Sequence, residues 1–297
     1  MVQIISKILT ILLRPFNKIN HEQKFMMGQI LSRMSSDKIV TELSDSEFKV
    51  FSQMGDDGII QYLIKKINIE NKYFIEFGVE NYTESNTRFL LMNNNWSGLI
   101  IDGSENNVNY IKKDDIYWKY DLTAKAAFIT AENINAIITD EGINGNIGIL
   151  SIDIDGNDYW VWKAIEVVTP DIVIIEFNSV FGERVITVPY DPKFNILEKH
   201  YSHLYFGASL SALNYLAKVK KYSFIGCNSS GLNAYFVKNE KLNGLTIKDI
   251  NKDFVKSKFR QARDVNNNID FSNYKKSQEI LKGLPVYNVV NNQIENF

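Results

Sequence analysis

The sequence is poor in cysteine, proline and glycine. Its 297 residues include one cysteine, which excludes an internal disulfide framework and a cysteine-rich zinc module. The 5 prolines and 16 glycines are too few for a disordered or fibrous protein. Lys and Arg number 33 against 35 Asp and Glu, so the net charge is −2. Nucleic acid is therefore not expected as the main partner, because no basic excess could neutralise its backbone.

The chain also lacks a run of the roughly 20 apolar residues that a membrane span needs. The first 20 residues come closest, but Lys7 and Arg14 interrupt them and no small-residue cleavage site follows. Apolar residues recur there at helical spacing, at Val2, Ile5, Leu9, Leu12, Leu13 and Phe16. We interpret this stripe as a helix that packs on its own domain or on a second copy in a homo-oligomer. Reversible contact of a cytoplasmic protein with an anionic membrane surface is the alternative.

From residue 73 onward, short apolar runs alternate with helical patterns. The predicted strands are Tyr73–Phe77, Gly98–Ile101, Ile116–Tyr120, Ile147–Ile152 and Asp171–Phe177. Strands that alternate with helices in this way indicate a parallel sheet covered on both faces. After a helix at Gly207–Val219, only NSSG joins two further strands, Tyr222–Cys227 and Leu232–Val237. These two strands must be antiparallel, since the joint has no room for a crossover helix.

A parallel sheet that ends in an antiparallel hairpin is the topology of the class I methyltransferase fold. The predicted fold class is therefore α/β, with a Rossmann-like, seven-stranded and mostly parallel sheet. We expect an N-terminal helical extension at residues 1–51 and a methyltransferase domain at 52–238. A C-terminal helical appendage should follow at 239–297, where two helical stretches flank the Asn-rich DVNNNID. Gly55 and two aspartates predict a further, N-capped helix just before the first strand.

The first predicted strand ends in FIEFGVEN, which places Glu76 and Gly78 where open α/β sheets bind ligands. The next helix begins near Thr83–Glu84, so its free N–H groups face the same crevice. Gly78 has no glycine partner at +2 or +5, and this argues against a dinucleotide. A cofactor without phosphates suits an acidic loop better. S-adenosylmethionine, with its ammonium and sulfonium cations, is such a cofactor.

Two more acids follow the next two predicted strands. Asp102 lies 26 residues after Glu76, where a carboxylate can accept hydrogen bonds from a ribose diol, and a helix N-cap is its alternative role. Asp121 suits the amino group of an adenine. The predicted cofactor-binding residues are Glu76, Gly78, Asn81, Asn86, Asp102, Gly103, Asp121 and Asp153.

The fourth and fifth predicted strands end in two pairs of oxygen-bearing side chains. Asp153 and Asp155 in SIDIDGNDYW share one face of an extended segment, and Glu176 and Asn178 in IIEFNS repeat that spacing. If the strands are neighbours, the four side chains converge, which is costly unless they bind a cation. Hard oxygen ligands predict Mg²⁺ or Mn²⁺ at these four residues. Simple capping of the turn at Gly156 is the alternative.

The segment Asp153-Ile-Asp155-Gly156 also matches the D-x-D-G-T start of the haloacid-dehalogenase phosphatases. Here Asn157 replaces the threonine, the motif follows the fourth strand, and no downstream Asp-Asp pair completes a metal site. A phosphatase is therefore the second candidate activity.

The acceptor side of the site is expected from the segment around residues 184–206. One of His200 and His203, in KHYSHLYFGASL, is the predicted general base, beside Asp155. Arg184 could hold a phosphate of a nucleotide-sugar. The aromatic residues expected to stack on a sugar are Tyr190, Tyr205 and Phe206.

The segments FIEFGVENYTESNTRFLL, WSGLIIDGSENN, LLSIDIDGNDYWVW and IVIIEFNS resemble the FkbM-type S-adenosylmethionine-dependent methyltransferases over about residues 52–237. The resemblance implies that Glu76 and Gly78 belong to the cofactor loop and that Asp102 binds the ribose. Asp153 and Asp155 would match the family's K-I-D-V-E-G element, with Ser151 in place of the lysine.

Two further segments, VPYDPKF and HLYFGASL, are similar to a subgroup found with bacterial capsule and lipopolysaccharide genes. The expected activity is methyl transfer to a hydroxyl of a nucleotide-sugar or polysaccharide precursor. An inactive adaptor that kept the fold is the non-enzymatic alternative.

Overall fold

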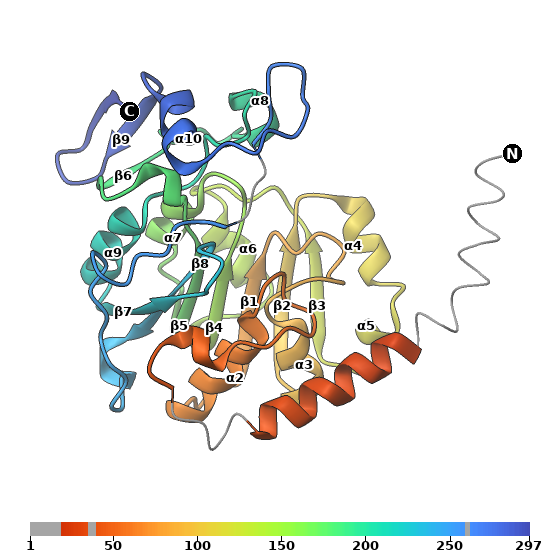
Figure 1. Cartoon of the computed structure of the whole chain (residues 1–297). Coiled ribbons are helices and arrows are strands. Elements are labelled where there is room, and N and C mark those ends of the chain that lie inside the picture. Colours follow the sequence, from red (N-terminus) through yellow and green to blue (C-terminus); the bar gives the residue numbers. More distant parts are fainter. Residues whose placement is uncertain (1–18, 35–39, 259–261) are drawn as a thin grey trace, which may run out of the picture.

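The computed structural model describes residues 19–34, 40–258 and 262–297, and its centre is a seven-stranded sheet (Figure 1). The strands in spatial order are β3 (Leu122–Ala126), β2 (Ser97–Asp102), β1 (Tyr73–Phe77), β4 (Gly145–Ile152), β5 (Val168–Glu176), β8 (Asn233–Lys238) and β7 (Tyr222–Cys227). The first five are parallel, and β8 runs antiparallel to both β5 and β7. The predicted fold class and the terminal hairpin are confirmed.

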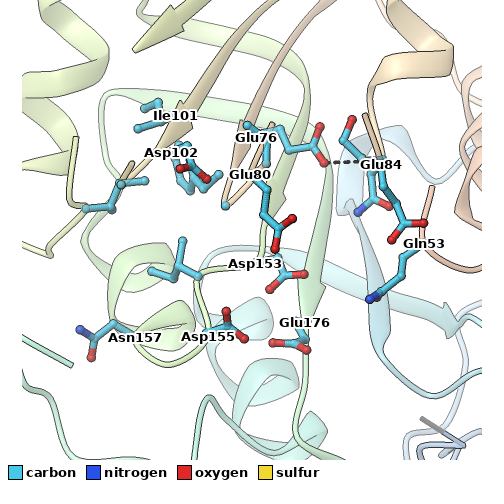
Figure 2. Close-up of a pocket in the computed structure, with 18 of the residues that line it drawn as sticks. Gln53, Glu76, Glu80, Glu84, Ile101, Asp102, Asp153, Asp155, Asn157 and Glu176 are labelled. Carbon is cyan, nitrogen blue, oxygen red and sulfur yellow. Dashed lines mark hydrogen bonds between the residues drawn. The ribbon is translucent and has the colours of Figure 1, made fainter. Parts of the chain in front are cut away.

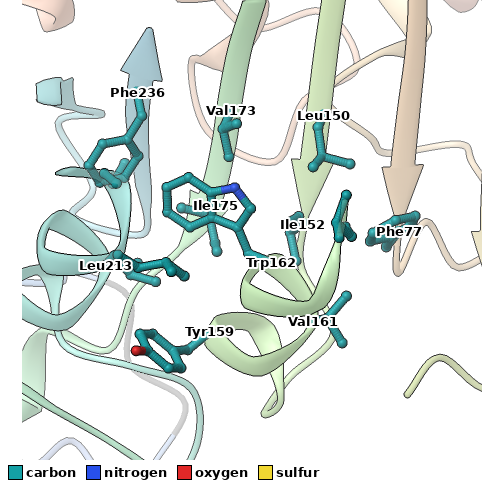
Figure 3. Packing of buried hydrophobic residues seen from close by; sticks show 14 of the residues in the cluster. Phe77, Leu150, Ile152, Tyr159, Val161, Trp162, Val173, Ile175, Leu213 and Phe236 are labelled. Atoms are coloured by element: carbon teal, nitrogen blue, oxygen red, sulfur yellow. The ribbon is translucent and has the colours of Figure 1, made fainter. Parts of the chain in front are cut away.

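Helices cover both faces of the sheet, and each face has its own apolar cluster. One face packs against α2 (Asp56–Lys66), α3 (Arg88–Asn94), α4 (Glu105–Ile111) and α5 (Asp115–Lys119). The other packs against α6 (Ile134–Asp140), α7 (Asp158–Ala164) and α9 (Leu210–Val219). Figure 3 shows the second cluster, in which the buried indole of Trp162 lies over Val173 and Ile175. Because β4 and β5 are buried on both faces, their sequences are almost continuously apolar.

The third strand lies one element later than the sequence predicted. Residues Ile116–Lys119 belong to α5, not to a strand, and Tyr120 is the C-cap of that helix. The β-branched and aromatic side chains favour a strand, but Asp114 accepts a hydrogen bond from the amide of Ile116 and caps a helix instead. As a result Asp121 precedes β3, and its carbonyl oxygen accepts from the amide of Gly98 near the start of β2. Asp121 is therefore exposed at the amino end of the sheet, opposite to the expected position.

The N-terminal extension includes a helix at residues 19–34 and a 3₁₀ turn at Leu43–Ser46. The apolar stripe predicted between Val2 and Phe16 lies outside the described residues. Gly55 precedes α2 as predicted. None of the helices that the structure describes has the length and apolar character needed to cross a bilayer.

The C-terminal segment differs from the predicted pair of helices. Among its described residues, only the stretch after DVNNNID forms an α-helix, α10 (Tyr274–Leu281), and the earlier stretch holds a 3₁₀ turn at Asn239–Lys241 followed by irregular chain. A second sheet joins β6 (Ile186–Thr187), β9 (Pro285–Asn288) and β10 (Gln293–Asn296). This sheet, α10 and the short helix α8 (Ile196–Lys199) gather at one end of the main sheet (Figure 1).

Candidate functional site

A cavity of about 450 Å³ lies at the carboxyl ends of β1, β2, β4 and β5. Seven carboxylates line it, drawn in Figure 2 with their neighbours: Glu76, Glu80, Glu84, Asp102, Asp153, Asp155 and Glu176. No Lys, Arg or His is among the described residues that line it. The field in the cavity therefore favours a cationic ligand and opposes a phosphate.

Glu76 organises the start of α3. Its Oε1 accepts a hydrogen bond from the amide of Asn86 at 2.8 Å, and its Oε2 accepts from the amide of Thr87 at 3.1 Å and from the Thr87 hydroxyl. Burial raises the pKa of Glu76 to about 7. The side-chain amide of Asn86 donates to the hydroxyl of Ser151 on β4, at 3.1 Å. The predicted residues Glu76 and Asn86 thus meet in the cavity wall, where both oxygens of Glu76 are already used.

Gly78 has a structural role that the sequence did not reveal. Its φ is +72°, and a Cβ atom there would lie 1.6 Å from the carbonyl oxygen of Asp153. The glycine is needed because the chain leaving β4 crosses it closely, and it also lines the cavity. Asn81 lies away from the cavity, where its Oδ1 accepts from the amide of Thr83 at 3.1 Å and closes a turn.

Asp102 ends β2 with one carboxylate oxygen used and one available. Its Oδ1 accepts from the amide of Ser104 at 2.8 Å and from the side-chain amide of Asn107 at 3.0 Å. The N-cap of α4 is Ser104 rather than Asp102, so the capping alternative holds only in an indirect form. No described residue donates a hydrogen bond to Oδ2, which belongs to a side chain in the cavity wall beside Gly103.

Apolar residues stand where the sequence placed an acid for the adenine. The chain after β3 contributes Ala127, Phe128 and Ile129 to the cavity wall. The predicted role of Asp121 is therefore wrong, because this residue lies before β3, at the amino end of the sheet, and not after it. An apolar wall next to Asp102 suits the flat face of a base.

Asp153, Asp155 and Glu176 form the predicted acidic cluster. One oxygen from each lies within 4.8 Å of the others, and Figure 2 shows the three carboxylates facing one another. Burial, and the repulsion between neighbouring carboxylates, raise the pKa values of Asp153 and Glu176 well above their ordinary values. Oε2 of Glu176 is buried and has no hydrogen-bond partner.

Asp158, and not Asp153 or Asp155, caps the turn that follows β4. The two oxygens of Asp158 accept from the amides of Ile154 and Gly156, each at 2.9 Å, and so hold the turn after β4. Asp155 adopts a left-handed conformation in this turn, with φ +54°, and its side chain is exposed to the cavity. The alternative role of these acids, capping, thus falls to Asp158 alone.

Asn178 is not part of the cluster. Its side-chain amide donates to the carbonyl oxygens of Leu204 and Phe206, at 2.8 and 3.0 Å, and its Oδ1 accepts from the amide of Val180. These contacts tie the segment after α8 to the end of β5 and leave no free ligand atom. Its predicted role as a metal ligand is therefore wrong.

The two histidines predicted as bases do not line the cavity. Nδ1 of His200 lies 2.7 Å from the hydroxyl of Ser202, and its ring packs on Tyr201. His203 occupies a turn with φ +55°. They were predicted to face the cavity because they precede the helix at Gly207–Val219 in the sequence. No periodic pattern, however, indicates where a side chain points in an irregular loop.

The predicted acceptor-binding residues make structural contacts instead, and two of them, Arg184 and Tyr205, bind the C-terminal segment. The guanidinium of Arg184 pairs with Glu295 at 2.5 Å, and the hydroxyl of Tyr205 donates to the carbonyl oxygen of Pro285. The hydroxyl of Tyr190 donates to Glu132 at 2.5 Å. These contacts, and the burial of Phe206 in the same cluster as Tyr205, place none of the four in the cavity wall.

Several cavity residues were missed from the sequence. Glu80 and Glu84 follow the first strand within FIEFGVENYTES, and the excess of acid in that loop was the available signal. Phe194 packs its ring over Gly156, where a Cβ would lie 2.2 Å from it. Gln53 comes from the loop that the carboxylate of Asp57 holds through three backbone amides.

No protein-family model matches this sequence, and no curated protein matches it either. The resemblance to FkbM-type enzymes therefore stays a prediction. The structure is similar to a S-adenosylmethionine-dependent methyltransferase from Clostridium acetobutylicum, with 11% identity, coverage of 62% of this chain and 90% of that one, and a TM-score of 0.41. It is also similar to the N-terminal domain of EvdMO1 with SAH bound, with 10% identity, coverage of 70% of this chain and 93% of that one, and a TM-score of 0.41. A third similar structure is the O-methyltransferase from Bacillus cereus in complex with SAH, with 13% identity, coverage of 76% of this chain and 90% of that one, and a TM-score of 0.36. Values this low assign no activity or ligand to the present chain.

Proposed function

We propose that this chain is an S-adenosylmethionine-dependent methyltransferase that methylates a saccharide hydroxyl. The supporting observation is the cavity at the carboxyl ends of β1, β2 and β4, which seven carboxylates line without any Lys, Arg or His among the described residues. A nucleotide cofactor with phosphates would meet repulsion there, whereas an ammonium and a sulfonium group would be stabilised. When bound, the cofactor supplies a methyl group activated by the positive sulfur.

The cavity offers a partner for each part of this cofactor. Oδ2 of Asp102 is free to accept hydrogen bonds from ribose hydroxyls. The apolar side chains of Phe128 and Ile129 fit an adenine. The carboxylate of Glu80 fits an ammonium group, whereas that of Glu84 already pairs with Lys49 at 3.2 Å.

Without a metal ion, the base for the acceptor hydroxyl is Asp155. Asp155 is exposed at the cavity and is held by the turn that Asp158 fixes, whereas Glu176 is buried. A positioned base contributes about 10²–10⁴-fold to such a transfer. Since no cationic side chain of the described residues lines the cavity, the sugar that enters it is uncharged, and any phosphate of a nucleotide-sugar stays outside.

We further propose that Asp153, Asp155 and Glu176 hold Mg²⁺ or Mn²⁺. Their oxygens approach within 4.8 Å of one another, and the unpartnered, buried Oε2 of Glu176 supports a missing cation. When bound, the ion would lower the pKa of the acceptor hydroxyl. Excess chelator followed by dialysis should then abolish turnover, and added Mg²⁺ or Mn²⁺ should restore it. Full turnover in chelator would overturn the metal without affecting the assignment of Asp102.

The test of the activity is transfer of labelled methyl from S-adenosylmethionine to a panel of neutral sugars, nucleotide-sugars and capsule fragments. Asp155→Asn should lower kcat by about 10²–10⁴-fold with unchanged cofactor affinity. Cofactor binding without transfer to any acceptor would favour the adaptor. Hydrolysis of phosphate esters that Asp153→Asn abolishes would favour the phosphatase, which the absence of cationic side chains in the described cavity wall opposes. A cytoplasmic location stays a prediction.

A further inference from the structure

The helix of residues 19–34 packs on the domain through one face. It lies on the outside of the molecule beside α3 (Figure 1). The ring of Phe25 meets Phe89 edge-on at 5.9 Å. A Cβ at Gly28 would lie 2.5 Å from Val50, so the two segments are in close contact. Further along the same face, the buried hydroxyl of Ser32 donates to the side chain of Gln61. The orientation of the helix is thus fixed by packing.

The opposite face is apolar and exposed. Five large side chains on it are each more than half exposed: Ile19, Met26, Met27, Ile30 and Met34. The last four lie seven, eight, eleven and fifteen residues after Ile19, and this spacing places all five on one stripe of the helix. A surface helix normally directs its apolar stripe to the core, but here the core side holds one large apolar side chain, Phe25, beside Gly28 and Ser32. Such a contiguous exposed patch marks an interaction surface.

Charge indicates which surface covers the stripe. Residues 1–34 contain five Lys and Arg and one Glu, a formal charge of +4, whereas the rest of the chain carries −6 within the total of −2. At about 100° per residue, Lys24 and Arg33 fall on opposite flanks of the stripe, and both are exposed. Glu22, which is also exposed, falls on the same flank as Arg33, so a second copy docked on this face would meet a flank of mixed charge. An anionic surface, in contrast, attracts the net positive charge of this segment.

We propose that this face docks on the surface of a bilayer rich in anionic lipid. The apolar stripe enters the boundary between headgroups and acyl chains, and the flanking basic side chains lie at the phosphates. This inference does not depend on the proposed methyl transfer, because the helix shares no residue with the cavity.

The test is cosedimentation of the full chain with vesicles. We expect binding to phosphatidylcholine vesicles that contain 30 mol% phosphatidylglycerol, at least tenfold weaker binding to pure phosphatidylcholine, and loss of binding in high salt. The double variant Met27→Glu with Ile30→Glu should bind at least tenfold more weakly than the wild type. The matched control, Val219→Glu with Val290→Glu, changes two equally exposed residues elsewhere and should bind normally.

Light scattering and thermal unfolding on the same samples complete the experiment. Because the substituted residues are exposed, the melting temperature should not change; if the double variant unfolds, the charge reversal Lys24→Glu with Arg33→Glu replaces it. Equal binding of wild type and variant, or no binding by the wild type, would overturn the proposal. A wild-type dimer that the same substitutions convert to a monomer would assign the face to a second copy instead.

Discussion

Asp102→Asn isolates the interaction on which cofactor binding depends most. The asparagine oxygen can still accept from the amide of Ser104 and the side chain of Asn107, so the start of α4 should keep its structure. At the position of Oδ2, however, a charged acceptor becomes an amide donor. A hydrogen bond to a charged group contributes about 1.5–3 kcal/mol, so the Kd for S-adenosylhomocysteine should rise about ten- to a hundred-fold.

Isothermal calorimetry on wild type and variant measures this change, and thermal unfolding checks the fold. The matched control is Asp121→Asn, an equally conservative change at the exposed opposite edge of the sheet, which should leave Kd unaltered. If Asp102→Asn binds as tightly as the wild type, the carboxylate only organises the turn before α4. If both variants lose affinity, the position of the cavity is wrong.

Three further predictions test the surroundings of the site. Gly78→Ala should destabilise the fold by about 3 kcal/mol or more in denaturant titrations because its Cβ meets the carbonyl oxygen that follows β4, whereas Gly142→Ala, at a similar φ but in open space, should cost only about 1 kcal/mol. Burial raises the pKa of Glu76 from 4.5 to about 7, so the stability it contributes is present below pH 4.5 and lost as the pH rises through 7; the fall in melting temperature over that range should be smaller in Glu76→Gln, and an identical fall would contradict the assignment. Neither His200→Ala nor His203→Ala should lower kcat appreciably, and a hundredfold loss in either would restore a histidine base.

Most of the sheet could be predicted because its strands are short apolar runs buried on both faces. Tyr73–Phe77 and Tyr222–Cys227 were predicted to the residue. The failure at Ile116–Tyr120 arose where local composition favoured a strand and a single capping aspartate, Asp114, decided for a helix. The C-terminal hairpin was missed because β9 and β10 are four residues each and β10, QIEN, contains one apolar residue.

The site was predictable to the extent that the sheet positions it. Glu76, Asp102, Asp153 and Glu176 meet because parallel strands end at one edge, and that follows from topology alone. Residues on irregular segments were not predictable, since neither His200 nor the residues around it show a period that reports where their side chains point. The contacts that exclude Asn178 as a metal ligand run from its side-chain amide to two loop carbonyl oxygens, 26 and 28 residues further along the chain.

The most direct test of the account is a crystal structure of the protein soaked with S-adenosylhomocysteine. We expect the ligand in the cavity of about 450 Å³, with its ribose hydroxyls within hydrogen-bond distance of Asp102 and its adenine against Phe128. A cavity that stays empty at saturating ligand, or a ligand bound away from these residues, would contradict the proposed function.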